Sequence, residues 1–238
     1  MNHDEIISKS QEVVRVLQNN KNKMAKVVNY QIGDSLFVFD FTENNSELVK
    51  LDLKNNETFN DFVFSEMDKN NSTVGIGKYD EDRLIYRRSQ LFAGAEEARS
   101  LHLGIDLWAV PGTKVFSPLA GRIHSFQDNN HFGDYGPTII LEHELDGCFF
   151  YTLYGHLSRE SLVGKQVGKL VTAGQEIATI GDSQINGNWP PHVHFQIMVD
   201  MLGKEGDFFG VAKPSERDYY LALCPNPNLI LNLKNLYD

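Results

Sequence analysis

Cysteine is scarce in this chain of 238 residues, which contains only Cys148 and Cys224. Two cysteines exclude a disulfide framework and a zinc site built from thiolates. No apolar run approaches the roughly 18 residues that a membrane-spanning helix needs. The first residues, MNHDEIISKSQEVVRVLQNN, show no apolar segment behind a basic start. We therefore expect no secretory signal and a cytoplasmic location.

An excess of positive charge is also absent. Twenty-two Lys and Arg residues stand against 32 Asp and Glu, which gives a formal net charge of −10. This balance argues against a protein that binds nucleic acid or acidic lipid by bulk attraction, so we expect no nucleic-acid partner and no membrane partner. A hydrophobic content of 41% with 23% charged residues is typical of a folded globular protein. Any metal site has to use the eight histidines together with carboxylates.

The patterns of apolar residues change near residue 72. Before it, they predict helices over 4–20 and 59–67, and strands over 25–32, 35–41 and 49–53, the first two joined by a hairpin turn at Gly33-Asp34. We interpret residues 1–72 as a small α+β N-terminal region. Residues 73–238 then form a second domain that ends in a closing segment packed on it.

Short strands and frequent glycines dominate this second region. Candidate strands cover residues 115–116, 121–126, 138–143, 149–153, 176–180 and 192–199. Many short strands at such spacing indicate a mainly β fold, an antiparallel sandwich or barrel.

Three clusters of residues could carry chemistry: His102-Leu-Gly-Ile-Asp106, Tyr154-Gly-His156 and His192-Val-His194. Residues i and i+2 of a strand face the same side, about 7 Å apart, so His192 and His194 can converge on one site. The alternative is a pair of histidines on a solvated face of the sheet.

His102 and Asp106 can share a site only if the segment between them is helical or bends sharply. Four residues of straight strand span about 13 Å, whereas the donor atoms that bind one zinc ion lie about 2 Å from it. Gly104 favours a bend, so we predict a kink or bulge at Leu103-Gly104. The alternative is that the two residues have no common role, because this spacing is frequent in proteins.

Together these clusters supply His, Asp and His ligands and leave a fourth position open, as in catalytic zinc sites. Such a zinc ion lowers the pKa of its bound water toward 7 and polarises a carbonyl group. No His-Glu-x-x-His helix is present, so the general base has to be a histidine that does not bind the metal. His156 and His192 are the candidates.

These motifs, with Pro111-Gly112-Thr113, Ala173-Gly174-Gln175 and Pro191-His192-Val-His194-Phe195, resemble the lysostaphin-type (LytM-like) zinc metallopeptidase domain over residues 100 to 200. The resemblance implies Zn²⁺ bound by His102, Asp106 and His194, with His156 and His192 as the catalytic histidines. It also implies a groove on an antiparallel β-sheet. The implied activity is that of a zinc metallopeptidase, a hydrolase that cleaves peptidoglycan-type peptides, or related small peptides and amides, with a zinc-bound water assisted by two histidines.

The sequence also departs from the family pattern around the expected groove. Asp134-Tyr135-Gly136-Pro137-Thr138 stands where relatives usually carry a Gly-Asn pair, and Gln196 replaces a frequent Glu. The stretches at 134–138, 151–156 and 189–192 are similar to a subgroup fused to class III aminotransferases, whose substrate does not follow from the residues. Tyr154 and Trp189 are candidates for contact with a peptide or muropeptide-like substrate, and their alternative is ordinary packing. The alternative for the whole domain is a zinc-binding module without catalysis that binds a partner or regulates it.

Overall fold

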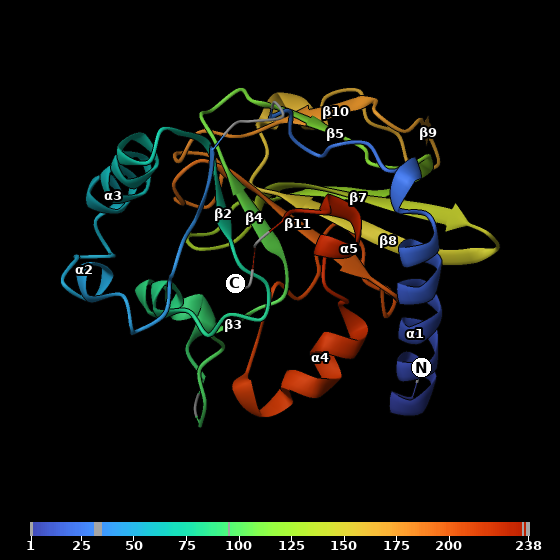
Figure 1. Cartoon of the computed structure of the whole chain (residues 1–238), viewed down its shortest axis with the longest axis horizontal. Coiled ribbons are helices and arrows are strands. Elements are labelled where there is room, and N and C mark those ends of the chain that lie inside the picture. Colours follow the sequence, from blue (N-terminus) through green and yellow to red (C-terminus); the bar gives the residue numbers. More distant parts are fainter. Residues whose placement is uncertain (1, 31–34, 95, 235, 237–238) are drawn as a thin grey trace.

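The computed structural model describes residues 2–30, 35–94, 96–234 and 236, and its centre is a large sheet (Figure 1). Adjacent strands of this sheet are antiparallel, except that β1 and β2 are parallel. In spatial order the strands are β1 (Ser35–Val38), β2 (Ser72–Gly77), β4 (Ile105–Trp108), β11 (His192–Met198), β8 (Cys148–Gly155), β7 (Gly136–Leu145), β6 (Gly121–Asn129) and β9 (Leu170–Val171). The expectation of a mainly β, antiparallel fold is confirmed.

Two pairs of short strands lie beside the large sheet. One pair is β5 (Lys114–Phe116) with β10 (Glu176–Thr179), and the other is β3 (Leu101–His102) with β12 (Val211–Ala212). The six strands expected between residues 115 and 199 therefore all form, as β5, β6, β7, β8, β10 and β11. Glycines and turns interrupt the sequence between them, as the pattern predicted.

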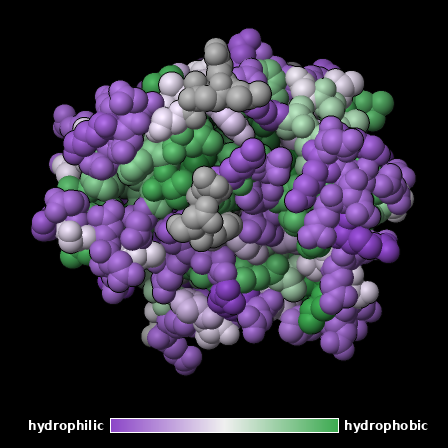
Figure 2. Space-filling model, in the orientation of Figure 1, coloured by the Kyte–Doolittle hydropathy of each residue, from purple (hydrophilic) through white to green (hydrophobic). Residues whose placement is uncertain are grey.

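Helices cover two sides of the sheet in Figure 1, with α3 at one end and α1 at the other. The helices are α1 (His3–Asn19), α2 (Ser46–Val49), α3 (Asn56–Lys69), α4 (Arg217–Leu223) and α5 (Asn228–Leu231). Short 3₁₀ helices lie at Lys21–Lys23, Leu84–Arg88, Gln90–Phe92, Arg159–Leu162 and Pro214–Glu216. Among the helices of the described ranges, none is long and apolar enough to cross a membrane. The face shown in Figure 2 is mostly hydrophilic, with smaller hydrophobic areas between the polar residues.

The two helices expected from the spacing are confirmed as α1 and α3. Asn2 caps α1, because its side chain accepts a hydrogen bond from the backbone N–H of Glu5 while the Glu5 carboxylate accepts one from the N–H of Asn2. Asn55 caps α3 in a similar way through the N–H groups of Glu57 and Thr58. Local capping signals and apolar spacing therefore agree for both helices.

The prediction of a strand over residues 49–53 is wrong. Asn45 accepts hydrogen bonds from the N–H groups of Glu47 and Leu48, and this cap starts the short helix α2 at Ser46. Leu48 is buried and Val49 is exposed. The apolar residues near 49–53 therefore belong to a short helix and the turns that follow it, and not to a β-strand.

The hairpin expected over residues 25–41 is only partly realised. Residues 35–38 form β1, but β1 pairs with β2 and not with the preceding segment. Within the described residues 25–30, the structure contains one isolated bridge, from Val28 to Val115, and no strand. The turn at Gly33-Asp34 lies outside the described residues.

The strand β2 was not expected, and it joins the two predicted regions. It lies between β1 and β4 in the sheet, and a Cβ atom on Gly75 would lie 2.4 Å from the ring of Phe39. The glycine thus lets an aromatic ring pack directly on the strand. The division into residues 1–72 and 73–238 stays a prediction, but both parts contribute strands to one sheet.

Helix α1 packs against β8, α4 and α5, and its apolar face belongs to the main core. The buried side chains on this face are Ile6, Val13, Val16 and Leu17. The N-terminal helix and the closing C-terminal segment therefore cover the same part of the sheet.

Replacing Leu17 by Ala is expected to lower the free energy of unfolding by about 2–5 kcal/mol, because it leaves a cavity at the helix–sheet contact. Ile7 is 37% exposed on the same helix and provides the matched control, Ile7→Ala. Urea unfolding followed by circular dichroism measures both. Equal stability of the Leu17→Ala variant and the unmodified protein would contradict a shared core.

Candidate metal centre

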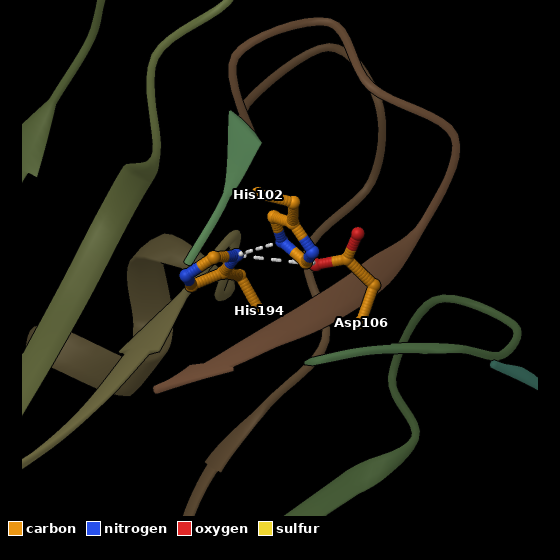
Figure 3. A group of neighbouring side chains, drawn as sticks. All are labelled: His102, Asp106 and His194. Carbon is orange, nitrogen blue, oxygen red and sulfur yellow. Dashed lines mark hydrogen bonds and ion pairs between the residues drawn. The ribbon is translucent and has the colours of Figure 1, made fainter. Parts of the chain in front are cut away.

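Three expected metal ligands meet where β3, β4 and β11 come together. In the antiparallel register His194 of β11 lies opposite Asp106 of β4, and His102 ends β3. Their side chains point toward one another in Figure 3. His102 Nε2 lies 2.9 Å from His194 Nδ1 and 3.3 Å from Asp106 Oδ1, and His194 Nδ1 lies 3.2 Å from Asp106 Oδ1.

The expected bend between His102 and Asp106 is confirmed. β3 ends at His102 and pairs with β12, whereas β4 begins at Ile105 and pairs with β11 and β2, so the chain changes partners across Leu103-Gly104. A Cβ atom on Gly104 would lie 2.4 Å from Cε1 of His194. Only glycine lets the bend pass this close to the imidazole.

The arrangement fits a zinc ion. Each of the three residues offers one ligand atom, and these atoms lie within 4.8 Å of one another. Ligand atoms about 2.0–2.1 Å from a tetrahedral ion are about 3.3 Å apart, close to the separations found here. Two imidazole nitrogens and one carboxylate oxygen are donors that zinc accepts, and three protein ligands leave one position open for catalysis.

Hydrogen bonds orient the two histidine ligands. Nδ1 of His102 lies 2.8 Å from the carbonyl oxygen of Lys78, which leaves Nε2 to the ligand cluster. Nε2 of His194 lies 2.9 Å from Oε1 of Gln196. The Gln196 amide nitrogen in turn donates to the carbonyl of Phe209 and to Sγ of Cys224. Such outer partners select the tautomer and fix the direction of each ring.

Arg83 neutralises the second oxygen of Asp106. Its guanidinium is buried, with Nη1 2.5 Å from Asp106 Oδ2, Nε 2.9 Å from Glu81 Oε2 and Nη2 donating to the carbonyl of Lys78. Because Arg83 binds Oδ2 of Asp106, the other carboxylate oxygen, Oδ1, faces His102 and His194. Two carboxylates and one arginine are thus buried together, and each of the three guanidinium nitrogens of Arg83 donates to an acceptor.

His156 and His192 flank the ligands from neighbouring strands, with ring centres 4.2 Å apart. Nδ1 of His156 lies 2.7 Å from the carbonyl of Asn186, and Nδ1 of His192 lies 2.7 Å from the carbonyl of Pro190. Nε2 of His192 is 3.7 Å from Asp106 Oδ1. The expectation that His192 and His194 face the same side is confirmed.

Backbone and packing hold these two rings in place. His156 follows β8 with a φ of 60°, a left-handed conformation that is uncommon for a residue with a side chain. The ring of His192 stacks on Trp108 with centres 4.0 Å apart. Both imidazoles are therefore fixed beside the metal ligands.

Burial controls the protonation of the site. It lowers the pKa of His102 to about 3 and that of His192 to about 4, and it holds the pKa of His156 well below its usual value. Burial acts to raise the pKa of Asp106, but the facing His102 and Arg83 outweigh it and hold that pKa well below the usual range. Neutral imidazoles and an ionised carboxylate are the forms that bind metal.

A cavity of about 180 Å³ opens beside this cluster. Asp106, His156, His192 and His194 line it, together with Trp189, which was expected to contact substrate. Trp189 is also packed among the rings of Phe59, Tyr86 and Phe92.

The other residue expected at the substrate, Tyr154, is fully buried and is not among the residues that line the cavity. Its hydroxyl lies 3.0 Å from the hydroxyl of Thr152, which in turn lies 2.7 Å from Nε2 of His143. The ring packs on Phe195. Tyr154 is therefore a core residue. His156, two residues later, reaches the site because the chain turns after Gly155.

Three further residues contact the cluster without a role assigned from the sequence: Arg83, Tyr135 and Gln196. Tyr135 and Gln196 had been noted only as departures around the expected groove. The hydroxyl of Tyr135 lies 3.5 Å from Nε2 of His194. Gln196 could have been found, because residues 192, 194 and 196 of one strand face the same side. Arg83 has no local signal, since it precedes the first ligand by 19 residues and belongs to no motif.

Comparison with protein families places this site in a known context. The sequence model of peptidase family M23 matches residues 100–206, which contain all three metal-ligand candidates and both further histidines. A comparison with curated proteins finds no match.

Several solved structures are similar to parts of the chain. A zinc-containing peptidase from Vibrio cholerae is 27% identical over 41% of this chain and 27% of its own, with a TM-score of 0.34. The catalytic domain of the antimicrobial peptidase lysostaphin from Staphylococcus simulans is 28% identical over 50% of this chain and 79% of its own, with a TM-score of 0.35. The A109H mutant of the catalytic domain of the prophage-encoded M23 protein EnpA from Enterococcus faecalis is 22% identical over 50% and 98%, with a TM-score of 0.36.

The aligned part of the chain thus spans about a quarter of the Vibrio cholerae structure. The family model covers the bend at Gly104, the Tyr-x-His motif and the His-x-His strand in one continuous match. Residues 100–206 of this chain therefore resemble a domain of peptidase family M23.

Proposed function

We propose that the protein is a zinc metallopeptidase that hydrolyses peptide bonds, with zinc bound by His102, Asp106 and His194. The observation that carries the proposal is the convergence of these three ligand atoms within 4.8 Å, beside two further imidazoles that line the same cavity. The match to a peptidase family supports hydrolysis as the reaction. Peptidoglycan-type peptides, which the sequence motifs imply, are one candidate substrate class.

When bound, zinc supplies a Lewis acid that polarises the scissile carbonyl group and acidifies water. The chain itself supplies proton transfer and orientation. Because Nδ1 of His156 and Nδ1 of His192 each donate to a backbone carbonyl, their Nε2 atoms carry free lone pairs. One of these Nε2 atoms accepts the proton of the attacking water, and the resulting imidazolium donates it to the leaving amine nitrogen. The other imidazole, also neutral, accepts a hydrogen bond from the attacking water through its Nε2 and orients it.

Replacement of a ligand histidine is expected to abolish stoichiometric zinc binding. In His102→Ala or His194→Ala only two ligands remain, and the bound zinc should fall from about one ion per chain toward zero. Elemental analysis after dialysis against a weak chelator measures this. His124 lies outside the cluster, so His124→Ala is the matched control. Full zinc occupancy in both ligand variants would contradict the assignment.

Replacement of His156 or His192 is expected to lower the rate of hydrolysis without loss of the metal. His156→Gln and His192→Gln should keep the metal and lose about 10²–10⁴-fold in kcat, because general acid–base catalysis contributes that much. Hydrolysis of glycyl and D-alanyl peptides by the zinc-loaded protein provides the assay. If the unmodified protein binds zinc but turns over none of them, a non-catalytic zinc-binding module becomes the better description.

Loss of Arg83 is expected to weaken zinc binding by about 10–100-fold, the usual effect of removing an outer partner of a metal ligand. Competition with a coloured chelator measures the affinity. Arg83→Met removes the partner of Glu81 Oε2 and leaves Lys78 on the other oxygen, so the Arg83→Met/Glu81→Gln double variant separates metal affinity from stability. Arg99 lines the same cavity but donates to the Leu91 carbonyl, so Arg99→Met is the control. Equal affinities of the Arg83 and Arg99 variants would exclude this role.

A further inference from the structure

We propose that the site takes a small peptide or amide of about one or two residues and excludes the middle of a longer peptide chain. This inference rests on the proposed function, because it concerns the substrate of the same site. The observations that carry it are the burial of the reacting groups, the contacts between the loop 133–135 and the cavity walls, and the volume and charge of the cavity.

The groups that would react lie deep in the protein. His102, Asp106 and His194 are at most 3% exposed. His156 is 5% exposed and His192 is 3% exposed. The scissile bond of a substrate can reach these atoms only if the part of the substrate that contains the bond enters the cavity.

Two walls of the cavity come from outside the segment that matches the peptidase family. Tyr86, Leu91 and Phe92 belong to the 3₁₀ helices at 84–92, and Phe208 to Val211 follow the matched segment. Hydrogen bonds fasten both walls: the N–H of Arg99 donates to the carbonyl of Phe92, and the N–H of Leu103 donates to the carbonyl of Gly210. Both walls are therefore fixed to residues 99 and 103, on either side of the strand that carries His102.

The loop 133–135 touches both walls. A Cβ atom on Gly133 would lie 2.6 Å from Oγ of Ser89, beside the first wall. A Cβ atom on Gly210, in the second wall, would lie 1.8 Å from the hydroxyl of Tyr135. The loop is in direct contact with each wall at these two glycines. An extended peptide therefore cannot pass between the loop and either wall at these points.

The volume agrees with a short substrate. The cavity measures about 180 Å³, whereas pockets for drug-sized ligands measure about 300–1,000 Å³ and a cavity of about 150 Å³ holds one benzene molecule. One or two amino-acid residues, without a chain continuing on both sides, match this space.

The charged residues that line the cavity also fit a short peptide. Outside the paired Arg83 and Asp106, the cavity has two cations, Arg99 and Lys204, and two carboxylates, Asp134 and Asp207. Lys204 Nζ lies 3.9 Å from an oxygen of Asp207. The balanced set favours a neutral or zwitterionic substrate, such as a free dipeptide, over a polyanionic polymer.

The test compares substrate lengths on the zinc-loaded full chain. Gly-Gly, D-Ala-D-Ala and their N-acetyl amides are set against pentaglycine and an intact muropeptide. We expect kcat/KM to be about tenfold or more higher for the best short substrate than for any long one. Leu91→Ala and Phe92→Ala, which shorten one wall, should raise the ratio of long to short substrate by about fivefold or more. Phe149 is exposed and does not line the cavity, so Phe149→Ala should leave the ratio unchanged.

A binding series makes the result independent of turnover. Calorimetry of the zinc-loaded His156→Gln variant with the same peptides should show tighter binding of the short ones. Leu91 is 39% exposed, so Leu91→Ala should not unfold the protein. It therefore shortens the wall even if Phe92→Ala fails to fold. Equal kcat/KM or equal affinity for pentaglycine and dipeptides overturns the inference while leaving the metallopeptidase in place. Zinc binding with no hydrolysis of any peptide overturns the proposed function, and the calorimetric series then decides the size limit alone.

Discussion

The buried carboxylate of Asp106 is the point on which the rest of the site depends. One oxygen faces the two ligand histidines and the other faces Arg83. A carboxylate in the protein interior is tolerated only when its charge is compensated and its lone pairs are used. Arg83 provides this compensation on one side, and a bound cation would provide it on the other. The need to satisfy one charge thus ties the metal centre to a residue outside the family segment.

The same relation appears on the opposite side of the cluster. Gln196 orients His194, and its amide is held by the carbonyl of Phe209 and the sulfur of Cys224. The candidate ligands and Gln196 come from the segment that matches M23, while the groups that hold His102, Asp106 and Gln196 come from residues 78–83 and 209–224. Arg83 and residues 209–211, which belong to these flanking segments, also line the cavity. The parts that position the ligands are therefore the parts that restrict access to them.

Local chemistry explains which elements the sequence predicted. Asn2 and Asn55 start α1 and α3 by capping, and the period of two in β11 directs His192 and His194 to one side. The strand expected near Val49 failed because a third asparagine cap, Asn45, started a helix there. The strand β2 was missed because its glycines weaken the strand pattern. In the fold they are needed, since Gly75 lies against Phe39 and Gly77 lies beside Arg83 and Trp108.

The sequence by itself determined the chemistry of the candidate ligands. Its spacing required a bend at Gly104, its strand period paired two histidines, and its shortage of cysteine left imidazole and carboxylate as donors. The tertiary structure alone decided what surrounds them. Arg83 reaches Asp106 from 23 residues away, Tyr135 approaches His194, and Tyr154 turns into the core while Trp189 stays at the cavity. Spacing along the chain specifies which side a residue faces, whereas contacts between distant segments depend on how the sheet and its flanking loops pack.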